Sequence, residues 1–170
     1  TITQQLVKNL YLTRDKYLAR KFEELLIVWH MERSLMAEAR LEADADVAQA
    51  TKDRIMELYI NGIEFGPQLY GIVRAAEAYY GKSAAELTPL EAAFLAANKP
   101  CPKCGHKRFT TQKWTPWWQE RMVGIMKRMR KDGIITDEQF VAEAPYVPRF
   151  VGWPQTDAKG PSHQIGGVEE

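Results

Sequence analysis

The stretch Thr1–Glu24 reads TITQQLVKNLYLTRDKYLARKFEE and predicts two consecutive helices that the rest of the chain is expected to support. Thr3 and Thr13 are candidate N-caps of these helices. The apolar residues of the first helix recur at helical spacing: Leu6, Val7, Leu10 and Tyr11. The apolar residues of the second do the same: Leu18, Phe22, Leu25 and Trp29. We therefore expect two amphipathic helices, with the second one central and well buried.

The polar face of the second predicted helix carries Lys16, Arg20 and Glu24 at successive steps of four residues. Lys16 and Arg20 repel each other at this spacing, and Arg20 precedes Glu24 in the less favourable order for an ion pair. One interpretation is an ordinary salt-bridged surface. The other is that these cations, together with Lys8 and Lys21, surround an anion such as phosphate or pyrophosphate.

Length and composition indicate one domain with a real core, because the chain has 170 residues and 45% of them are apolar. A formal net charge of +1 gives no general attraction to nucleic acid, so we expect no nucleic-acid partner. No apolar run in the sequence approaches the length that crosses a bilayer.

The remainder of the chain predicts an all-α domain with an irregular C-terminal tail, because helix caps are dense and alternating strand patterns are absent. Cap signals predict helical turns beginning near Thr51, Ser83, Thr88, Thr115 and Thr136. Residues 37–50 are interpreted as a solvated insertion and residues 99–115 as a loop. Gly81 and Gly133 are expected to end helices, and the tail from residue 145 is expected to be extended or disordered.

A cluster of cations near residue 130 and two neighbouring tryptophans leave alternatives open. The cations suit the C-terminal end of a helix dipole, and anionic lipid headgroups are a second interpretation. They are Lys127, Arg128, Arg130 and Lys131. Trp117 and Trp118 are expected in the core, with anchoring at a membrane interface as the alternative.

Three motifs resemble signatures of the family 51 glycosyltransferases, the bacterial peptidoglycan polymerases. They are Thr1-Ile2-Thr3-Gln4-Gln5, Arg20-Lys21-Phe22-Glu23-Glu24 and the run from Lys52 to Asn61, KDRIMELYIN. The resemblance covers roughly Thr1 to Ala144 and implies the C-terminal portion of a lysozyme-like glycosyltransferase domain. We accordingly expect residues 1–144 to form a partial domain and residues 145–170 to form a Pro/Gly-rich tail or linker.

The resemblance implies an enzyme that polymerises lipid II into glycan strands and releases a lipid pyrophosphate. It assigns Glu24 to catalysis. It assigns substrate binding to Thr1, Thr3, Gln4, Gln5, Lys8, Lys16, Arg20 and Lys21. It assigns a structural role to Lys52, Ile55, Glu57, Tyr59 and Asn61. Lys16 replaces the arginine usual in the family, which keeps the charge and loses the bidentate fork.

The resemblance also implies partners and a location. The expected partners are lipid II, the lipid-linked glycan chain, the membrane surface and cell-wall synthesis proteins. The expected location is the outer face of the bacterial cytoplasmic membrane, with the anchor in a segment outside this sequence. Mg²⁺ or Mn²⁺ is a candidate cofactor at the pyrophosphate. The family's principal base belongs to a motif upstream of Thr1, so we expect these 170 residues alone to be inactive.

Cys101, Cys104 and His106 depart from the family pattern. They supply three ligands at most, and a stable zinc site needs four, so zinc is not expected. A disulfide and a reduced pair are the alternatives. Two other functions follow as alternatives to the enzyme. One is a non-catalytic helical module that binds lipid-linked precursors or cell-wall proteins, and the other is a metal- or redox-dependent interaction module built on the cysteine pair.

Overall fold

The computed structural model describes residues 1–11, 19–41 and 46–153, apart from the side chains of residues 19 and 20. These residues form eight α-helices, one short 3₁₀ helix and one two-stranded hairpin. They divide into two compact units, residues 1–64 with 68–74, and residues 65–67 with those from 75 onward. The predicted all-α class is confirmed, and the hairpin is an addition to it. Within the described ranges, no helix is both long and apolar enough to cross a bilayer.

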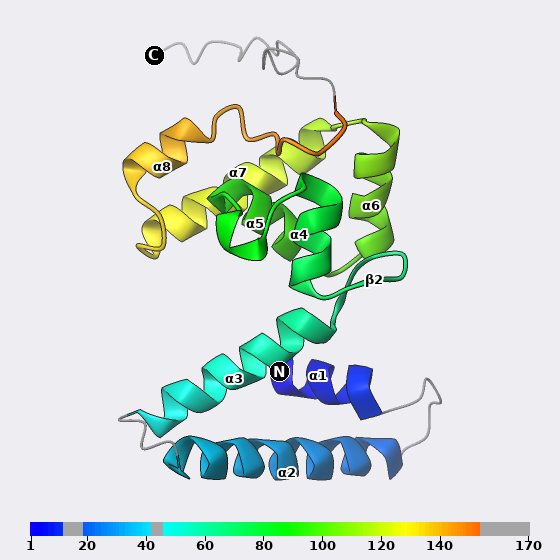
Figure 1. Cartoon of the computed structure of the whole chain (residues 1–170), viewed down its shortest axis with the longest axis vertical. Helices are drawn as coiled ribbons and strands as arrows, with labels where there is room; N and C mark the ends of the chain where they lie inside the picture. Colours follow the sequence, from blue (N-terminus) through cyan, green and yellow to red (C-terminus); the bar gives the residue numbers. More distant parts are fainter. Residues whose placement is uncertain (12–18, 42–45, 154–170) are drawn as a thin grey trace, which may run out of the picture. The chain divides into compact units, whose positions relative to one another are not determined.

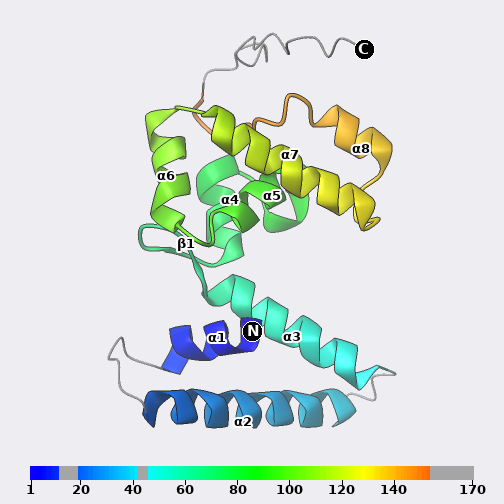
Figure 2. The ribbon, with the colours of Figure 1, turned by 180° about the vertical axis from the view of Figure 1, so that it is seen from behind.

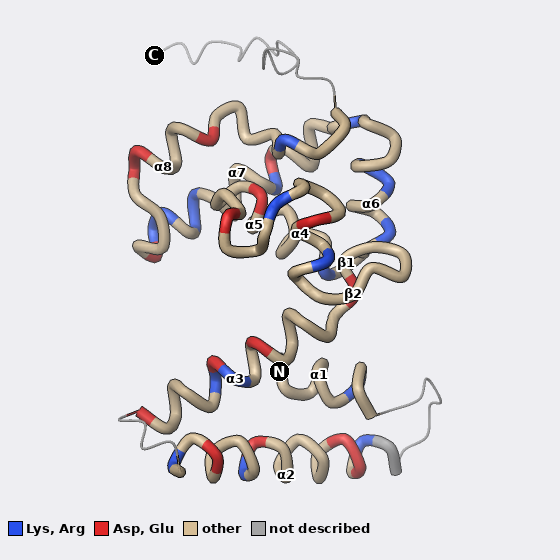
Figure 3. Tube along the Cα trace, viewed as in Figure 1, with Lys and Arg blue, Asp and Glu red and all other residues tan. Residues whose placement is uncertain are grey.

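The first unit is built from three helices that pack against one another in all three pairings (Figure 1). They are α1 (Ile2–Tyr11), α2 (Ala19–Leu41) and α3 (Val47–Gly62). Its buried side chains come from all three helices: Thr3, Leu6, Val7, Glu24, Ala39, Thr51, Ile55 and Tyr59. Acidic and basic residues alternate along α2 and α3, so neither helix forms a surface of one charge (Figure 3).

Two predicted N-caps of this unit are wrong by a few residues. The helix α1 begins at Ile2, where the Thr1 hydroxyl accepts the Gln4 N–H at 3.2 Å, and Thr3 lies inside the helix. The helix α3 begins at Val47 with Asp46 as its N-cap. Thr51 is buried within α3 and donates its hydroxyl to the Val47 carbonyl at 2.6 Å. The predicted insertion at residues 37–50 therefore supplies the end of α2 and the beginning of α3. Thr13 lies outside the described residues.

The predicted buried stripe of α2 is wrong. Phe22, Leu25 and Trp29 are 72%, 56% and 57% exposed, and Leu18 lies outside the described residues. The inner face of α2 is instead the row Glu24, Ile27, Val28, Met31, Leu35 and Ala39, which is buried or half-buried at helical spacing. Apolar residues surround this helix almost completely between residues 25 and 29, so periodicity alone did not select the packed face. On α1 the prediction is half right, because Leu6 and Val7 are buried whereas Leu10 and Tyr11 are exposed.

A hairpin of β1 (Glu64–Gly66) and β2 (Leu69–Tyr70) follows α3. Strands of three and two residues are too short to show the alternation that predicts a strand. Gly71 leaves the hairpin at a φ of +84°, where a Cβ would lie 2.9 Å from the Asn61 carbonyl oxygen. This position therefore requires glycine.

The remaining helical segments are α4 (Ile72–Tyr80), the 3₁₀ helix η1 (Ala84–Glu86), α5 (Pro89–Ala97), α6 (Pro102–Thr111), α7 (Pro116–Lys131) and α8 (Asp137–Ala142). Four of them, η1, α5, α7 and α8, begin at the predicted cap signals. Complete capping boxes form at Ser83, Thr88 and Thr136, as predicted. The helix α7 packs against α5 and α8 (Figure 2). Gly81 and Gly133 follow α4 and α7 at φ of +65° and +72°, and these predicted helix ends are confirmed.

The prediction of a loop at residues 99–115 is wrong, because most of it forms α6. Pro102 occupies the first turn of α6, and Gln112 ends the helix at a φ of +53°. Pro and Gly in this stretch favour a loop by local preference. The helix is held by tertiary packing, since the Phe109 ring meets the Tyr79 ring edge-on with centroids 5.0 Å apart.

The core of the second unit is aromatic and includes part of the predicted tail. The Phe94 side chain is fully buried and meets Tyr79, Trp118 and Phe150 at centroid distances of 5.9, 5.6 and 4.8 Å. Phe150 is 5% exposed, and the Trp153 indole N–H donates to the Phe109 carbonyl at 3.0 Å. Residues 145–153 therefore have irregular backbone, as predicted, but they pack on the core. The boundary at residue 144 stays a prediction, and residues from 154 onward lie outside the described part.

Because two tyrosines are buried, we expect the free energy of unfolding to fall at high pH. Burial raises the pKa of Tyr79 to about 12, and it raises the pKa of Tyr80 well above 10.0. The unfolded chain then releases these protons near pH 10 while the folded chain keeps them, so stability is retained below pH 10 and falls as the pH rises towards 12. We expect the free energy of unfolding in urea to fall by roughly 2 kcal/mol for Tyr79 over this range. Tyr79→Phe should make the decline shallower, and an equally steep decline in that variant would contradict the assignment.

Candidate functional site

The first and third motifs meet through one hydrogen bond between side chains 54 residues apart in the sequence. The Tyr59 hydroxyl, on α3, donates to the Gln5 Oε1 atom, on α1, at 2.7 Å. Tyr59 is 5% exposed, and burial raises its pKa above 10.0. A protonated, buried phenol at this position fixes the orientation of the Gln5 amide. That Tyr59 braces a substrate site stays a prediction.

The second motif places a carboxylate in the packed face of α2. Glu24 is 6% exposed, and its Oε2 atom lies 3.3 Å from the Lys21 ammonium. The Lys21 side chain is 79% exposed, so the ion pair joins a buried acid to a cation at the surface. Burying a charge is costly unless it is paired, and the Lys21 ammonium provides that pair for Glu24.

Two of the four predicted cations, Lys8 and Lys21, lie at one end of the first unit. Lys8 is in the last turn of α1 and Lys21 is in the first turn of α2, and these two helix ends lie at the same end of the unit (Figure 1). Both side chains are exposed. Lys16 lies outside the described residues, and the side chain of Arg20 is likewise not described.

The other predicted binding residues of α1 are placed differently from one another. Thr3 is 6% exposed and is turned into the helix packing. Gln4 is half-buried, and its backbone N–H is engaged by Thr1 at the start of the helix. The structure therefore brings Gln5 to Tyr59 and Lys21 to Glu24. A role in substrate binding for Thr1, Thr3 and Gln4 stays a prediction.

The residues of the third motif lie on α3, where some pack against the neighbouring helices and one forms an ion pair. Ile55 is 8% exposed, whereas Lys52 is exposed. The Glu57 carboxylate accepts from the Arg54 guanidinium at 2.6 Å, and Asn61 donates its side-chain amide to the Glu57 carbonyl at 3.0 Å. Within this motif, Ile55 and Tyr59 therefore hold α3 against its neighbours.

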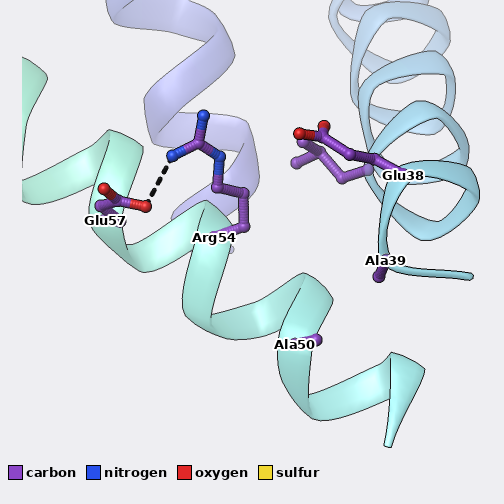
Figure 4. A pocket seen from close by; sticks show the side chains of 6 residues that line it. Glu38, Ala39, Ala50, Arg54 and Glu57 are labelled. Atoms are coloured by element: carbon purple, nitrogen blue, oxygen red, sulfur yellow. Dashed lines mark hydrogen bonds and ion pairs between the residues drawn. The ribbon is translucent and has the colours of Figure 1, made fainter. Parts of the chain in front are cut away.

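A hollow of about 340 Å³ lies between the C-terminal half of α2 and the first three turns of α3 (Figure 4). Its lining comprises Leu35, Glu38, Ala39, Ala50, Arg54 and Glu57. The Glu38 carboxylate points across it towards Arg54, whose guanidinium is hydrogen-bonded to Glu57. Sequence reasoning did not single out Arg54, although its spacing of three from Glu57 is typical of a helical ion pair. Of the motif residues, this lining contains Glu57, to which a structural role is assigned, and it contains none of the residues predicted to bind substrate.

The cysteine pair forms a disulfide between Cys101 and Cys104. Of the three alternatives for this pair, the structure has the disulfide. In this state neither sulfur is a thiolate, so the predicted weak metal candidates Cys101, Cys104 and His106 do not form a ligand set. Across the described ranges, no group of three or more His, Cys, Asp or Glu residues is placed to hold a metal ion.

A comparison with models of known protein families shows to which family the chain belongs. The model of the family described as "Transglycosylase" matches residues 1–130. The chain belongs to the transglycosylase family. The match contains all three motifs, and it extends through the helices α1 to α6 and most of α7.

Curated transglycosylase relatives support the same membership. Penicillin-binding protein 1A of Aquifex aeolicus (strain VF5) is 38% identical over 145 residues, which are 82% of this chain and 17% of that protein. A biosynthetic peptidoglycan transglycosylase of Acinetobacter baumannii (strain ATCC 17978) is 45% identical over 103 residues, covering 61% of this chain and 39% of that protein. A crystal structure of penicillin-binding protein 1A from Haemophilus influenzae aligns with a TM-score of 0.47 and 28% identity, covering 68% of this chain and 16% of that one. The chain thus spans well under half the length of these relatives.

Tyr59→Phe tests the contact between the first and third motifs. Loss of the hydroxyl leaves the Gln5 oxygen without its donor, so we expect the free energy of unfolding to fall by about 1 kcal/mol. The matched control is Tyr70→Phe, because Tyr70 belongs to the same unit and is 51% exposed. Urea unfolding of both variants is the measurement, and equal losses would show that the contact with Gln5 is not what stabilises the unit.

Proposed function

We propose that the protein is a peptidoglycan glycosyltransferase that polymerises lipid II into glycan strands with release of a lipid pyrophosphate. One observation carries this proposal: the three family motifs lie on three helices that pack against one another, and Tyr59 joins the third motif to the first. The family match over residues 1–130 and the names of the relatives support it.

The proposed reaction joins two lipid-linked sugars. A sugar hydroxyl oxygen attacks the anomeric carbon of the growing chain and loses its proton to a base, while the bond from that carbon to the pyrophosphate oxygen breaks. The departing pyrophosphate carries several negative charges, so the transition state is stabilised by cations placed beside it. Lys8 and Lys21 supply such cations at one end of the first unit, and Lys16 and Arg20 are proposed to add to them.

Glu24 is proposed to organise this cationic end. Its buried carboxylate orients the Lys21 ammonium through the contact at 3.3 Å. A carboxylate held within the helix packing also supplies a fixed negative charge close to the reacting groups. The bracing contact of Tyr59 with Gln5 places an oriented amide on the neighbouring helix.

The location and partners of the protein are also proposed from its membership of the transglycosylase family. We place the protein at the outer face of the bacterial cytoplasmic membrane, where its lipid-borne substrate is consumed and other cell-wall synthesis proteins act. Mg²⁺ or Mn²⁺ at the pyrophosphate was a candidate cofactor. The part of the chain that the structure describes offers no set of three acidic, His or Cys ligands for it, so no step is assigned to a metal.

Polymerisation of lipid II by the intact protein tests the proposal. Purified protein in detergent or vesicles is incubated with fluorescent lipid II, and products are separated by gel electrophoresis before and after digestion with a muramidase. We expect a ladder of glycan strands that the muramidase removes. Lipid II binding without any strand formation would favour the non-catalytic module, and the absence of both would contradict the proposal.

A further inference from the structure

The Cys101–Cys104 disulfide spans the first turn of α6 and serves no purpose in the proposed glycosyl transfer. Cys101 is the N-cap of this ten-residue helix, and Pro102 begins it. The two cysteines differ in accessibility, because Cys104 is exposed whereas Cys101 is half-buried. The pair therefore lies at the surface, with one residue more accessible than the other.

The disulfide contributes little to stability by constraining the unfolded chain. A disulfide of this kind stabilises a protein more when it closes a longer loop. The sequence separation of Cys101 and Cys104 is three residues, so the closed ring is very short. Its presence calls for a reason other than holding the fold together.

The first turn of α6 is held in place by contacts that do not involve the sulfur atoms. The Cys101 N–H donates to the Asn98 carbonyl at 3.0 Å, and the Cys104 N–H donates to the Cys101 carbonyl at 2.9 Å. Gly105 packs so closely on Asn98 that a Cβ at this position would overlap the Asn98 Oδ1 atom. We therefore expect α6 to keep its position when the sulfur–sulfur bond is reduced, so that the bond can be reduced and re-formed in the folded protein.

A mostly buried polar cluster beneath this turn contacts α6 through His106 and involves neither sulfur atom. It comprises Phe65, Tyr79, Asn98 and His106, joined by three contacts. The Asn98 amide donates to the Phe65 carbonyl at 3.4 Å, and the Tyr79 hydroxyl donates to the same carbonyl at 3.0 Å. The Tyr79 hydroxyl also lies 3.2 Å from His106 Nδ1. Asn98 is fully buried, and its Oδ1 atom, directed at α6, has no hydrogen-bond partner among the described residues.

The two sulfurs are suited to different steps of thiol–disulfide exchange. Cys104 is the more exposed residue of the pair, so an incoming thiolate is expected to attack its sulfur. The electron pair then leaves on Cys101, where the helix N-terminus stabilises negative charge on a thiolate. Lys103 and Lys107 are exposed one helical turn apart, and their charges attract an anionic thiolate to this surface.

We propose that Cys101–Cys104 is a reversible thiol–disulfide exchange site whose partner is a dithiol oxidoreductase. One thiolate of the partner attacks Cys104 Sγ, which breaks the bond to Cys101 Sγ and forms a mixed disulfide. The second partner thiolate then attacks the partner's own sulfur in that mixed disulfide and releases Cys104. The partner is oxidised to its disulfide, and Cys101 and Cys104 take up two electrons and two protons. This inference does not depend on the proposed glycosyltransferase activity.

Trapping of the mixed disulfide tests the proposal. The oxidised, folded full-length protein is incubated with a thioredoxin-type protein whose second active-site cysteine is replaced by serine, and adducts are mapped by mass spectrometry. We expect a covalent adduct linked through Cys104, at least tenfold more abundant than one linked through Cys101. An adduct that forms only in denaturant, or one linked chiefly through Cys101, would overturn the proposal.

A second measurement separates an exchange site from a structural disulfide. The urea midpoint of the oxidised protein is compared with that of the reduced protein and of the Cys101→Ser/Cys104→Ser double variant. We expect the three midpoints to agree, because the contacts of Asn98 and Gly105 hold the turn in all of them. A large drop in the reduced protein and in the double variant would show that the bond is structural, and the proposal would then be wrong.

Discussion

Glu24→Gln in the intact protein is expected to lower the rate of glycan polymerisation by about 10²–10³-fold, with little change in stability. Glutamine has nearly the same shape, so it fills the same buried space on the inner face of α2. It cannot carry the negative charge that pairs with the Lys21 ammonium. Removal of one preorganised electrostatic group from an active site costs a factor of this size. Initial rates with fluorescent lipid II are the measurement.

Glu23→Gln is the matched control, because it makes the same change at the preceding, exposed residue of α2. We expect this variant to retain activity within about threefold of the unchanged protein, as surface substitutions usually have small effects. Circular dichroism and urea unfolding of both variants exclude misfolding as the cause. Equal losses of activity in the two variants, or none in either, would contradict a special role for the buried acid.

Trp118→Ala is expected to lower the free energy of unfolding by about 3–5 kcal/mol, the usual cost of deleting a large aromatic side chain from a core. Trp118 is 6% exposed, and its ring lies 5.6 Å from that of Phe94 and 6.0 Å from that of Trp114. Its removal leaves a cavity beside Phe94, which is fully buried. Urea unfolding followed by circular dichroism measures this loss.

The neighbouring residue of α7 provides the control, since Trp117→Ala deletes the same side chain from a position that is 59% exposed. Trp117 contacts the Arg121 guanidinium at 5.4 Å and the Trp118 ring at 5.3 Å, so we expect a smaller loss of about 1 kcal/mol. Of the two tryptophans predicted in the core, Trp118 is confirmed and Trp117 is wrong. Similar losses for both variants would contradict the assignment of Trp118 to the core.

Several helix boundaries set by local chemistry were predictable from sequence, although the N-caps predicted at Thr3 and Thr51 are wrong. The boxes Ser83–Glu86 and Thr88–Glu91 satisfy backbone N–H groups within four residues, so their signal survives without tertiary context. Gly81 and Gly133 ended helices for an equally local reason, the left-handed backbone that they adopt.

Features that depend on packing were not predictable in the same way. The buried face of α2 was misassigned because Phe22 and Trp29 are as apolar as the residues that α1 and α3 cover. The helix α6 was missed because Gly105 weakens a helix locally, whereas its fit against Asn98 requires a residue without a side chain.

Little of the candidate site follows from residue patterns alone. The spacing of Lys16, Arg20 and Glu24 leaves both a plain salt-bridged surface and an anion site open, and only the resemblance to a family favours the anion site. The contact of Tyr59 with Gln5 joins residues 54 positions apart, so only the fold reveals it. The burial of Glu24 is likewise a property of the packed helices and not of the sequence around it.

The central claim is that the first unit holds the lipid pyrophosphate. Photo-crosslinking tests it most directly, using the intact protein and a lipid II analogue with a diazirine close to its pyrophosphate. The account predicts that labelled peptides come chiefly from residues 1–24, which contain Lys8 and Lys21, and that unlabelled lipid II competes for the label. Label found chiefly in the basic helices α6 and α7, or spread evenly along the chain, would contradict it.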